Sequence, residues 1–135
     1  MTDQLWYKFR TAVFQQEYSI AEQLLADNPD LILWHNGLGE TPLHYLAVEN
    51  DLKGVAWLHK KGSSLDVKNI FGEPVIFEVA LLGYKELLVW FFEQGADFKV
   101  KDNDDNDLIS YLQERDKLDM IKFIITDAHL TSNLS

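Results

Sequence analysis

The stretch Gly39-Glu-Thr-Pro-Leu-His-Tyr-Leu-Ala47 returns in weaker form one repeat later. Gly39 and Gly72 are 33 residues apart. The same interval separates Ala47 from Ala80, Asn50 from Gly83, Val55 from Leu88, Leu58 from Phe91, and Gly62 from Gly95. A third copy follows at this period, with Asp105 in the place of Gly72. A period sustained over three copies indicates units that are stable only when stacked on their neighbours.

Each copy predicts two short helices. Apolar residues follow helical spacing from Ile76 to Ala80, and again over residues 87–92. Thr41 followed by Pro42 predicts an N-cap and a first helical residue. Gly62 and Gly95 stand where second helices should end, because glycine accepts positive φ. The sequence therefore predicts an all-α fold of stacked helix-turn-helix units.

Residues 39 to 47, together with this period, resemble the ankyrin repeat, whose signature is a β-turn, T-P-L-H-x-A and two antiparallel helices. The resemblance implies a solenoid with β-turns that project as fingers, in which residues 1–135 form one domain. That domain would consist of an N-terminal capping repeat at 1–35, repeats at 36–68 and 69–101, and a C-terminal capping repeat at 102–135. The N-terminal cap is offset by one residue.

Several positions depart from the family pattern. Leu46 replaces an expected alanine, and Gly54 interrupts a helix at a cost of about 1 kcal/mol. Pro74 stands where threonine is usual, so we expect the central repeat to lack a hydroxyl cap. In the last repeat Asp105 takes the place of the turn glycine, while Asp107 can replace threonine as an N-cap. Atypical terminal repeats are expected, because one of their faces meets solvent.

The composition is strongly acidic, with 22 Asp and Glu against 12 Lys and Arg and a formal net charge of -10. This charge repels nucleic acid and anionic membranes, and it favours a partner with a basic surface. The chain has no cysteine, which excludes disulfides and thiolate metal sites. The N-terminus does not resemble a signal peptide, and no apolar stretch approaches about 20 residues. We expect a cytoplasmic protein that is monomeric when free.

No pattern in the sequence predicts catalysis, a metal or a cofactor. The histidines at positions 35, 44, 59 and 129 form no i, i+4 pair with an intervening glutamate. His44 closes the T-P-L-H turn, where the resemblance implies a hydrogen-bonding role in the scaffold. We find no glycine-rich phosphate loop, nucleophile elbow or paired acids in a pocket. The chain is therefore expected not to be an enzyme.

Residues 102–107 partly match a calcium-binding loop, with oxygen ligands conceivable at 102, 104 and 106. The sixth position is Asp107 rather than glycine, and the twelfth is Gln113 rather than glutamate. A solvated turn therefore explains the segment better than a cation site does. Calcium binding stays open as the alternative, to be tested by its effect on the melting temperature.

Aromatic residues recur once per repeat at Trp57, Trp90 and Phe123. A ladder of this kind is compatible with a binding groove. Large side chains on second helices more often pack neighbouring repeats together, and this is the role we predict for them.

The resemblance implies that a partner lies across the fingers and the first helices. The register places these candidate binding residues there: Leu38, Glu40, Val48, Glu49, Ile70, Phe71, Glu73, Leu81, Leu82, Asp104 and Glu114. Exposed apolar residues that are grouped together tend to mark interaction sites, and the central repeat supplies most of them. We predict a non-catalytic protein-protein interaction module, with an apolar centre ringed by acids. The alternative is an acidic inhibitor of the immunity type that neutralises a basic toxin or nuclease.

Overall fold

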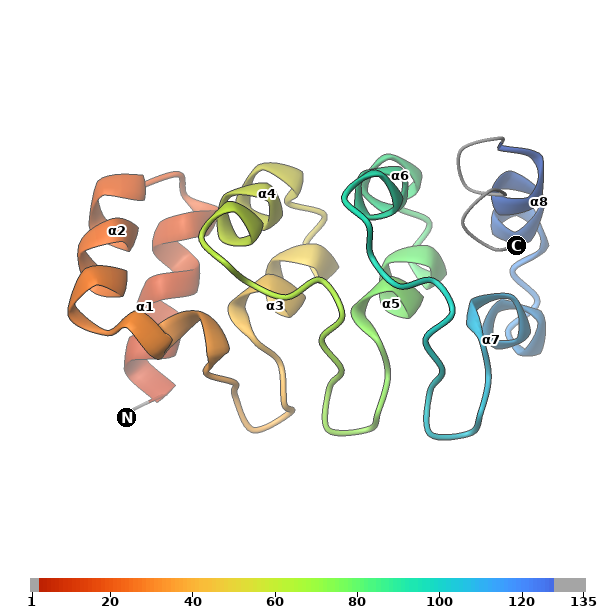
Figure 1. The fold of residues 1–135 in the computed structure, drawn as a ribbon, viewed down its shortest axis with the longest axis horizontal. Coiled ribbons are helices and arrows are strands. Elements are labelled where there is room, and N and C mark those ends of the chain that lie inside the picture. Colours follow the sequence, from red (N-terminus) through yellow and green to blue (C-terminus); the bar gives the residue numbers. More distant parts are fainter. Residues whose placement is uncertain (1–2, 128–135) are drawn as a thin grey trace.

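The computed structural model describes residues 3–127, which form a row of helix pairs (Figure 1). The pairs are α1 (Asp3–Phe14) with α2 (Tyr18–Asp27), α3 (Pro42–Val48) with α4 (Leu52–Lys60), α5 (Val75–Leu81) with α6 (Lys85–Glu93), and α7 (Leu108–Glu114) with α8 (Leu118–Thr126). A short 3-10 helix, η1 (Pro29–Leu33), follows α2. The end of the predicted last repeat, residues 128–135, lies outside the described part.

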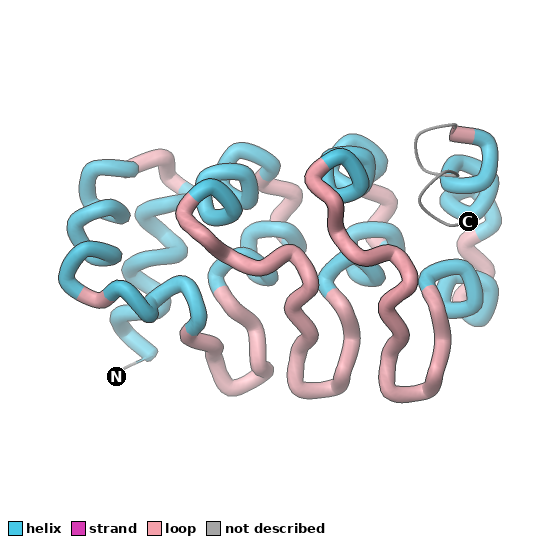
Figure 2. The backbone as a smooth tube through the Cα atoms, viewed as in Figure 1, coloured by secondary structure: helices cyan, strands magenta, loops and turns pink. Residues whose placement is uncertain are grey.

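The helices form two layers. The first helices α1, α3, α5 and α7 pack side by side in one row, and the second helices lie in a row above them (Figure 1). Long loops project from the row of first helices as parallel fingers (Figure 2). Residues 3–127 contain no named strand, and the isolated bridge between Lys68 and Pro74 joins the two sides of one finger. The predicted all-α solenoid is confirmed.

None of the helices described between residues 3 and 127 is long and apolar enough to cross a membrane.

One apolar core runs through the stack without interruption. Val55, Leu88 and Ile121 occupy equivalent positions in successive repeats, and all three are buried. Leu58 and Phe91 are a second such pair, with no exposed surface in either side chain. Burying a side chain of this size contributes about 1.5–3 kcal/mol. The 33-residue period therefore sets the spacing of the core.

The aromatic ladder joins neighbouring repeats, as predicted. Trp57 of α4 stacks on Tyr18 of α2, with ring centroids 5.5 Å apart. Trp90 of α6 meets His59 of α4 edge-on at 5.7 Å. Each tryptophan thus contacts the repeat before its own, which is a packing role rather than that of a free groove.

The helix caps follow the predictions made from the sequence. The Thr41 hydroxyl accepts a hydrogen bond from the His44 backbone N–H, at 3.4 Å. The Asp107 carboxylate accepts one from the Ser110 backbone N–H, at 2.8 Å. Helix α5 follows Pro74 and has no side-chain cap. The central repeat has indeed lost the hydroxyl cap.

The repeat is also visible in the backbone angles. Gly39 and Gly72 both have φ of 75°, and Asp105 takes the same left-handed conformation at 62°. Aspartate tolerates this region better than most residues because its short side chain can bond locally. The last finger therefore keeps the shape of the others without the glycine.

Candidate partner-binding surface

Each finger is held by the side chain of one residue at its base, and these residues are Asn36, Asn69 and Asp102. In the second finger Asn69 Oδ1 accepts hydrogen bonds from the backbone N–H groups of Phe71 and Glu73, at 2.9 and 3.1 Å. Asn36 and Asp102 make the same pair of bonds in their own fingers, at 2.9 to 3.0 Å. A carboxamide or carboxylate oxygen therefore fixes the finger from within.

Neighbouring fingers are also bonded to one another. The Ile70 backbone N–H donates to the Leu38 carbonyl at 2.9 Å, and Asn103 Nδ2 donates to the Phe71 carbonyl at 3.1 Å. A β-carbon on Gly39 would stand 2.6 Å from the Ile70 backbone nitrogen. Glycine thus permits the close approach of the first two fingers, and the row behaves as one surface.

The tips of the fingers carry exposed apolar side chains. Leu38 is 52% exposed, Ile70 61% and Phe71 62%. Asp104 occupies the equivalent position on the last finger and is also exposed. Large apolar side chains in contact with solvent on adjacent, rigid fingers are suited to be covered by a partner.

The predicted acids Glu40 and Glu73 lie at the base of the fingers and are partly buried. Asn36 Nδ2 donates to Glu40 Oε1 at 2.9 Å. The Tyr111 hydroxyl donates to Glu73 Oε2 at 3.3 Å, which links the central repeat to the last one. Both carboxylates are therefore positioned by hydrogen bonds to the scaffold.

Tyr111 keeps its proton at any physiological pH. Burial raises the pKa of its hydroxyl to about 12, with Arg115 opposing the change and the nearby Glu73 carboxylate supporting it. The Arg115 guanidinium lies over the Tyr111 ring, 3.7 Å from its centroid. The hydroxyl is thus a permanent donor to Glu73.

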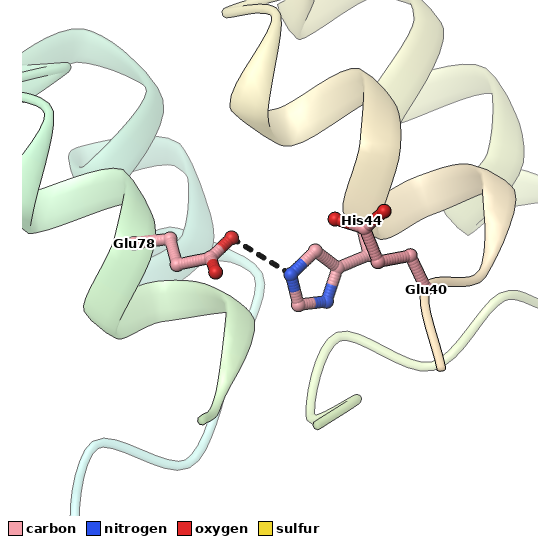
Figure 3. A group of neighbouring side chains, drawn as sticks. All are labelled: Glu40, His44 and Glu78. Carbon is pink, nitrogen blue, oxygen red and sulfur yellow. Dashed lines mark hydrogen bonds and ion pairs between the residues drawn. The ribbon is translucent and has the colours of Figure 1, made fainter. Parts of the chain in front are cut away.

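A further acid, Glu78 of α5, completes this region and was missed by the sequence analysis. Glu78 Oε2 lies 2.8 Å from His44 Nε2, so the pair joins α5 to α3 (Figure 3). Glu78 Oε1 also accepts from Asn69 Nδ2 at 3.3 Å. Tyr45, Glu78 and Tyr111 occupy equivalent positions in successive repeats, 33 residues apart, and Glu78 is the charged one. This difference was the signal in the sequence.

His44 has the scaffold role that the resemblance implied. Its side chain is fully buried, and its bond to Glu78 crosses from one repeat to the next. Glu40 lies beside this pair, and one ligand atom from each of Glu40, His44 and Glu78 lies within 4.8 Å of the others. The search for two histidines at i, i+4 could not find this group, because it contains one histidine and its third member, Glu78, comes from the next repeat.

Basic side chains lie at the two ends of the acidic region. Arg10 of α1 lies over the Tyr45 ring at 4.0 Å, while Arg115 covers Tyr111. The carboxylates at the centre of the surface, those of Glu40, Glu73 and Glu78, form no ion pair with a lysine or arginine of residues 3–127.

The remaining predicted residues lie at the far ends of the first helices. Val48 and Leu81 are half buried, and Glu49, Leu82 and Glu114 are exposed. Leu81 and Leu82 are about 10 Å along the helix axis from the start of α5, at 1.5 Å per residue.

The structure does not unite the predicted apolar residues in one patch. Leu81 and Leu82 line a hollow shared with Leu118 at the start of α8, whereas Ile70 lines another hollow with His35 between the first two fingers. The apolar centre that we expected is thus divided along the axis of α5.

The acidic run 102–107 forms the third finger. Asp102 accepts two backbone hydrogen bonds, and Asp107 caps α7, so both carboxylates serve the turn. Lys101 Nζ lies 3.4 Å from Asp105 Oδ1. These bonds explain the segment as a turn, in line with the preferred interpretation.

Comparison with known proteins agrees with this geometry. A family model described as "Ankyrin repeats (many copies)" matches residues 43–92, which include α3 to α6 and the finger between them. No curated protein matches the chain. Helix pairs continue on both sides of the matched repeats, as α1 with α2 and as α7 with α8, and the finger residues Gly39, Gly72 and Asp105 keep the 33-residue period. Residues 43–92 therefore belong to the ankyrin-repeat family, and the helix pairs on either side extend the same architecture.

Proposed function

We propose that this protein binds another protein across its fingers and the adjoining ends of its first helices, without catalysing a reaction. Ankyrin repeats generally mediate protein-protein interaction. The observation that carries the proposal is the row of exposed fingertip residues Leu38, Ile70 and Phe71 on fingers that are bonded to one another. A rigid surface loses little conformational entropy when a partner covers it.

The partner should present basic side chains to the base of the fingers. Glu40, Glu73 and Glu78 gather there without an arginine or lysine partner among the described residues. Asp104 extends the negative charge to the last fingertip. An apolar contact at the tips and a charged contact below them would together fix the orientation of the partner.

The test is a comparison of captured proteins from the source cell. Immobilised wild-type protein and two variants, Phe71→Ser and Leu33→Ser, are exposed to the same lysate, and retained proteins are quantified by mass spectrometry. Leu33 is the matched control, because it is 62% exposed like Phe71 but belongs to η1 rather than to a finger. The partner should be retained in equal amounts by the wild type and by Leu33→Ser, and in a smaller amount by Phe71→Ser. Equal retention by all three would remove the proposal.

A second function, inhibition of a basic toxin or nuclease in the manner of an immunity protein, is supported by the net charge of -10. An acidic surface suits the blocking of a cationic active site, and steering would speed association. The same capture experiment separates the two functions. Recovery of a basic nuclease whose activity falls to background in the complex supports inhibition, whereas a partner that remains fully active supports the adaptor role.

A further inference from the structure

Glu40, His44 and Glu78 form a mixed nitrogen and oxygen cluster between the first two complete repeats (Figure 3). Their ligand atoms lie within 4.8 Å of one another, and the closest pair, His44 Nε2 and Glu78 Oε2, is 2.8 Å apart. Around a zinc ion with bonds of about 2.0–2.2 Å, tetrahedral ligands are separated by about 3.4 Å. To surround an ion, the His44–Glu78 contact would have to lengthen by about 0.6 Å, and a pair at the 4.8 Å limit would have to shorten by about 1.4 Å.

Each member of the cluster is already held in place. The His44 side chain is completely buried, and its Nε2 atom points toward Glu78. Asn36 Nδ2 donates to Glu40 Oε1, and Asn69 Nδ2 donates to Glu78 Oε1. These amides orient the carboxylates as outer-shell groups orient metal ligands.

The surroundings also favour a cation. No lysine or arginine among residues 3–127 forms an ion pair with Glu40 or Glu78. The Glu78 side chain is 20% exposed, and Glu40 is also partly exposed, which leaves an entry path from solvent. A divalent ion would offset the repulsion between the two carboxylates.

We propose that Glu40, His44 and Glu78 bind one zinc ion, with water in the fourth position. One imidazole nitrogen and two carboxylate oxygens are a donor set that zinc accepts, whereas calcium and magnesium require six or more oxygen ligands. The ion would link α5, through Glu78, to the first finger and to α3. Binding would therefore stabilise the stack of repeats as well as occupy the base of the proposed partner surface.

The ring proton of His44 limits the affinity for zinc. Nε2 must give up its proton to coordinate zinc, so the proton of the neutral ring moves to Nδ1. Nδ1 is buried and has no hydrogen-bond partner. Loss of one outer-shell partner typically weakens metal binding by about 10- to 100-fold. We expect saturable binding that is weaker than at a site in which every outer-shell hydrogen bond is made.

Isothermal titration of the full chain with zinc chloride at pH 7 tests the site, together with Glu40→Gln, His44→Gln and the control Glu49→Gln. A glutamine at 40 can still accept from Asn36, and a glutamine at 44 can still donate to Glu78, so both variants preserve scaffold bonds. Glu49 is an exposed carboxylate at the far end of α3. Circular dichroism of each variant checks that it folds.

One zinc ion should bind the wild type and Glu49→Gln with equal affinity, and Glu40→Gln should bind at least about tenfold more weakly. Zinc at about 100 times its dissociation constant should raise the melting temperature of the wild type by roughly 5–10 °C. Absence of binding up to millimolar zinc, or equal affinity of Glu40→Gln and the wild type, would overturn the proposal. So would calcium binding as tightly as zinc, which would indicate an all-oxygen site elsewhere.

Discussion

The side chain of Leu46 occupies the space beside Gly54, where a β-carbon would lie 3.0 Å from Leu46 Cδ1. The same β-carbon would collide with the Asp51 carboxylate, which accepts a hydrogen bond from the Gly54 backbone N–H at 3.1 Å and caps α4. Leu46 and Gly54 each depart from the ankyrin pattern. In the structure the larger residue and the missing side chain fit together.

Gly54→Ala should therefore destabilise the protein by about 1–3 kcal/mol. The gain in helix propensity is about 1 kcal/mol, but displacement of the cap costs about as much and crowding of Leu46 costs about 1–3 kcal/mol. Urea unfolding measures the difference. Gly37→Ala is the control, because its β-carbon would have no neighbour within 4 Å, and its stability should stay within about 0.5 kcal/mol. A Gly54→Ala variant more stable than the wild type would contradict this packing.

Trp90→Ala should destabilise the stack by about 3 kcal/mol, near the lower end of the range for a tryptophan in a core, because Trp90 is only partly buried. The substitution removes its contacts with Phe91 and with His59 of the preceding repeat. The affinity of Trp90→Ala for the partner protein, measured at a temperature where the variant is folded, should stay within about twofold of that of the wild type. A variant with normal stability and no binding would place the binding surface on the second helices instead.

Asp51 gives a prediction for pH. Burial raises the pKa of its carboxyl above the ordinary value of 3.8, although the Gly54 N–H and Lys53 oppose the change. A raised pKa in the folded state means that the stabilising contribution of this group is complete below pH 3.8 and is lost as pH rises through the folded pKa. Asp51→Asn has no such loss. The free energy of unfolding of Asp51→Asn minus that of the wild type should therefore increase between pH 4 and pH 7, as measured by urea unfolding. A difference that stays constant over this range would contradict a raised pKa for Asp51.

Salt should weaken partner binding. Charges at the base of the fingers and on a basic partner are screened within about 10 Å at 0.1 M ionic strength. The dissociation constant should rise by roughly tenfold between 50 and 500 mM sodium chloride, mainly through slower association. Surface plasmon resonance at several salt concentrations measures both rates. Affinity that does not change with salt would remove the argument for a basic partner.

The features that the sequence predicted are those that repeat. Core positions such as Val55 and Leu88 follow from a pattern that recurs in each copy, and the Thr41 cap follows from the local Thr-Pro motif. Glu78 could not be found in this way, because its importance comes from bonds to His44 and Asn69, two residues that only the fold brings beside it.

The division of the predicted apolar centre has a similar cause. Phe71 and Leu82 are close in the sequence, but α5 separates them along its axis. Register in a repeat predicts which layer a residue joins. It does not predict which side chains of one unit meet, since that depends on helix length and on the direction of the finger.

The most direct test of the binding surface is the affinity of Phe71→Ala for the purified partner, compared with that of Leu33→Ala, by isothermal titration. Phe71→Ala should bind about 2 kcal/mol more weakly, or roughly 30-fold, as expected when an aromatic anchor is removed. Leu33→Ala should bind like the wild type, and both variants should unfold at the wild-type urea midpoint, because both side chains are exposed. Equal affinity of Phe71→Ala and wild type would contradict the proposal that the partner covers the fingers.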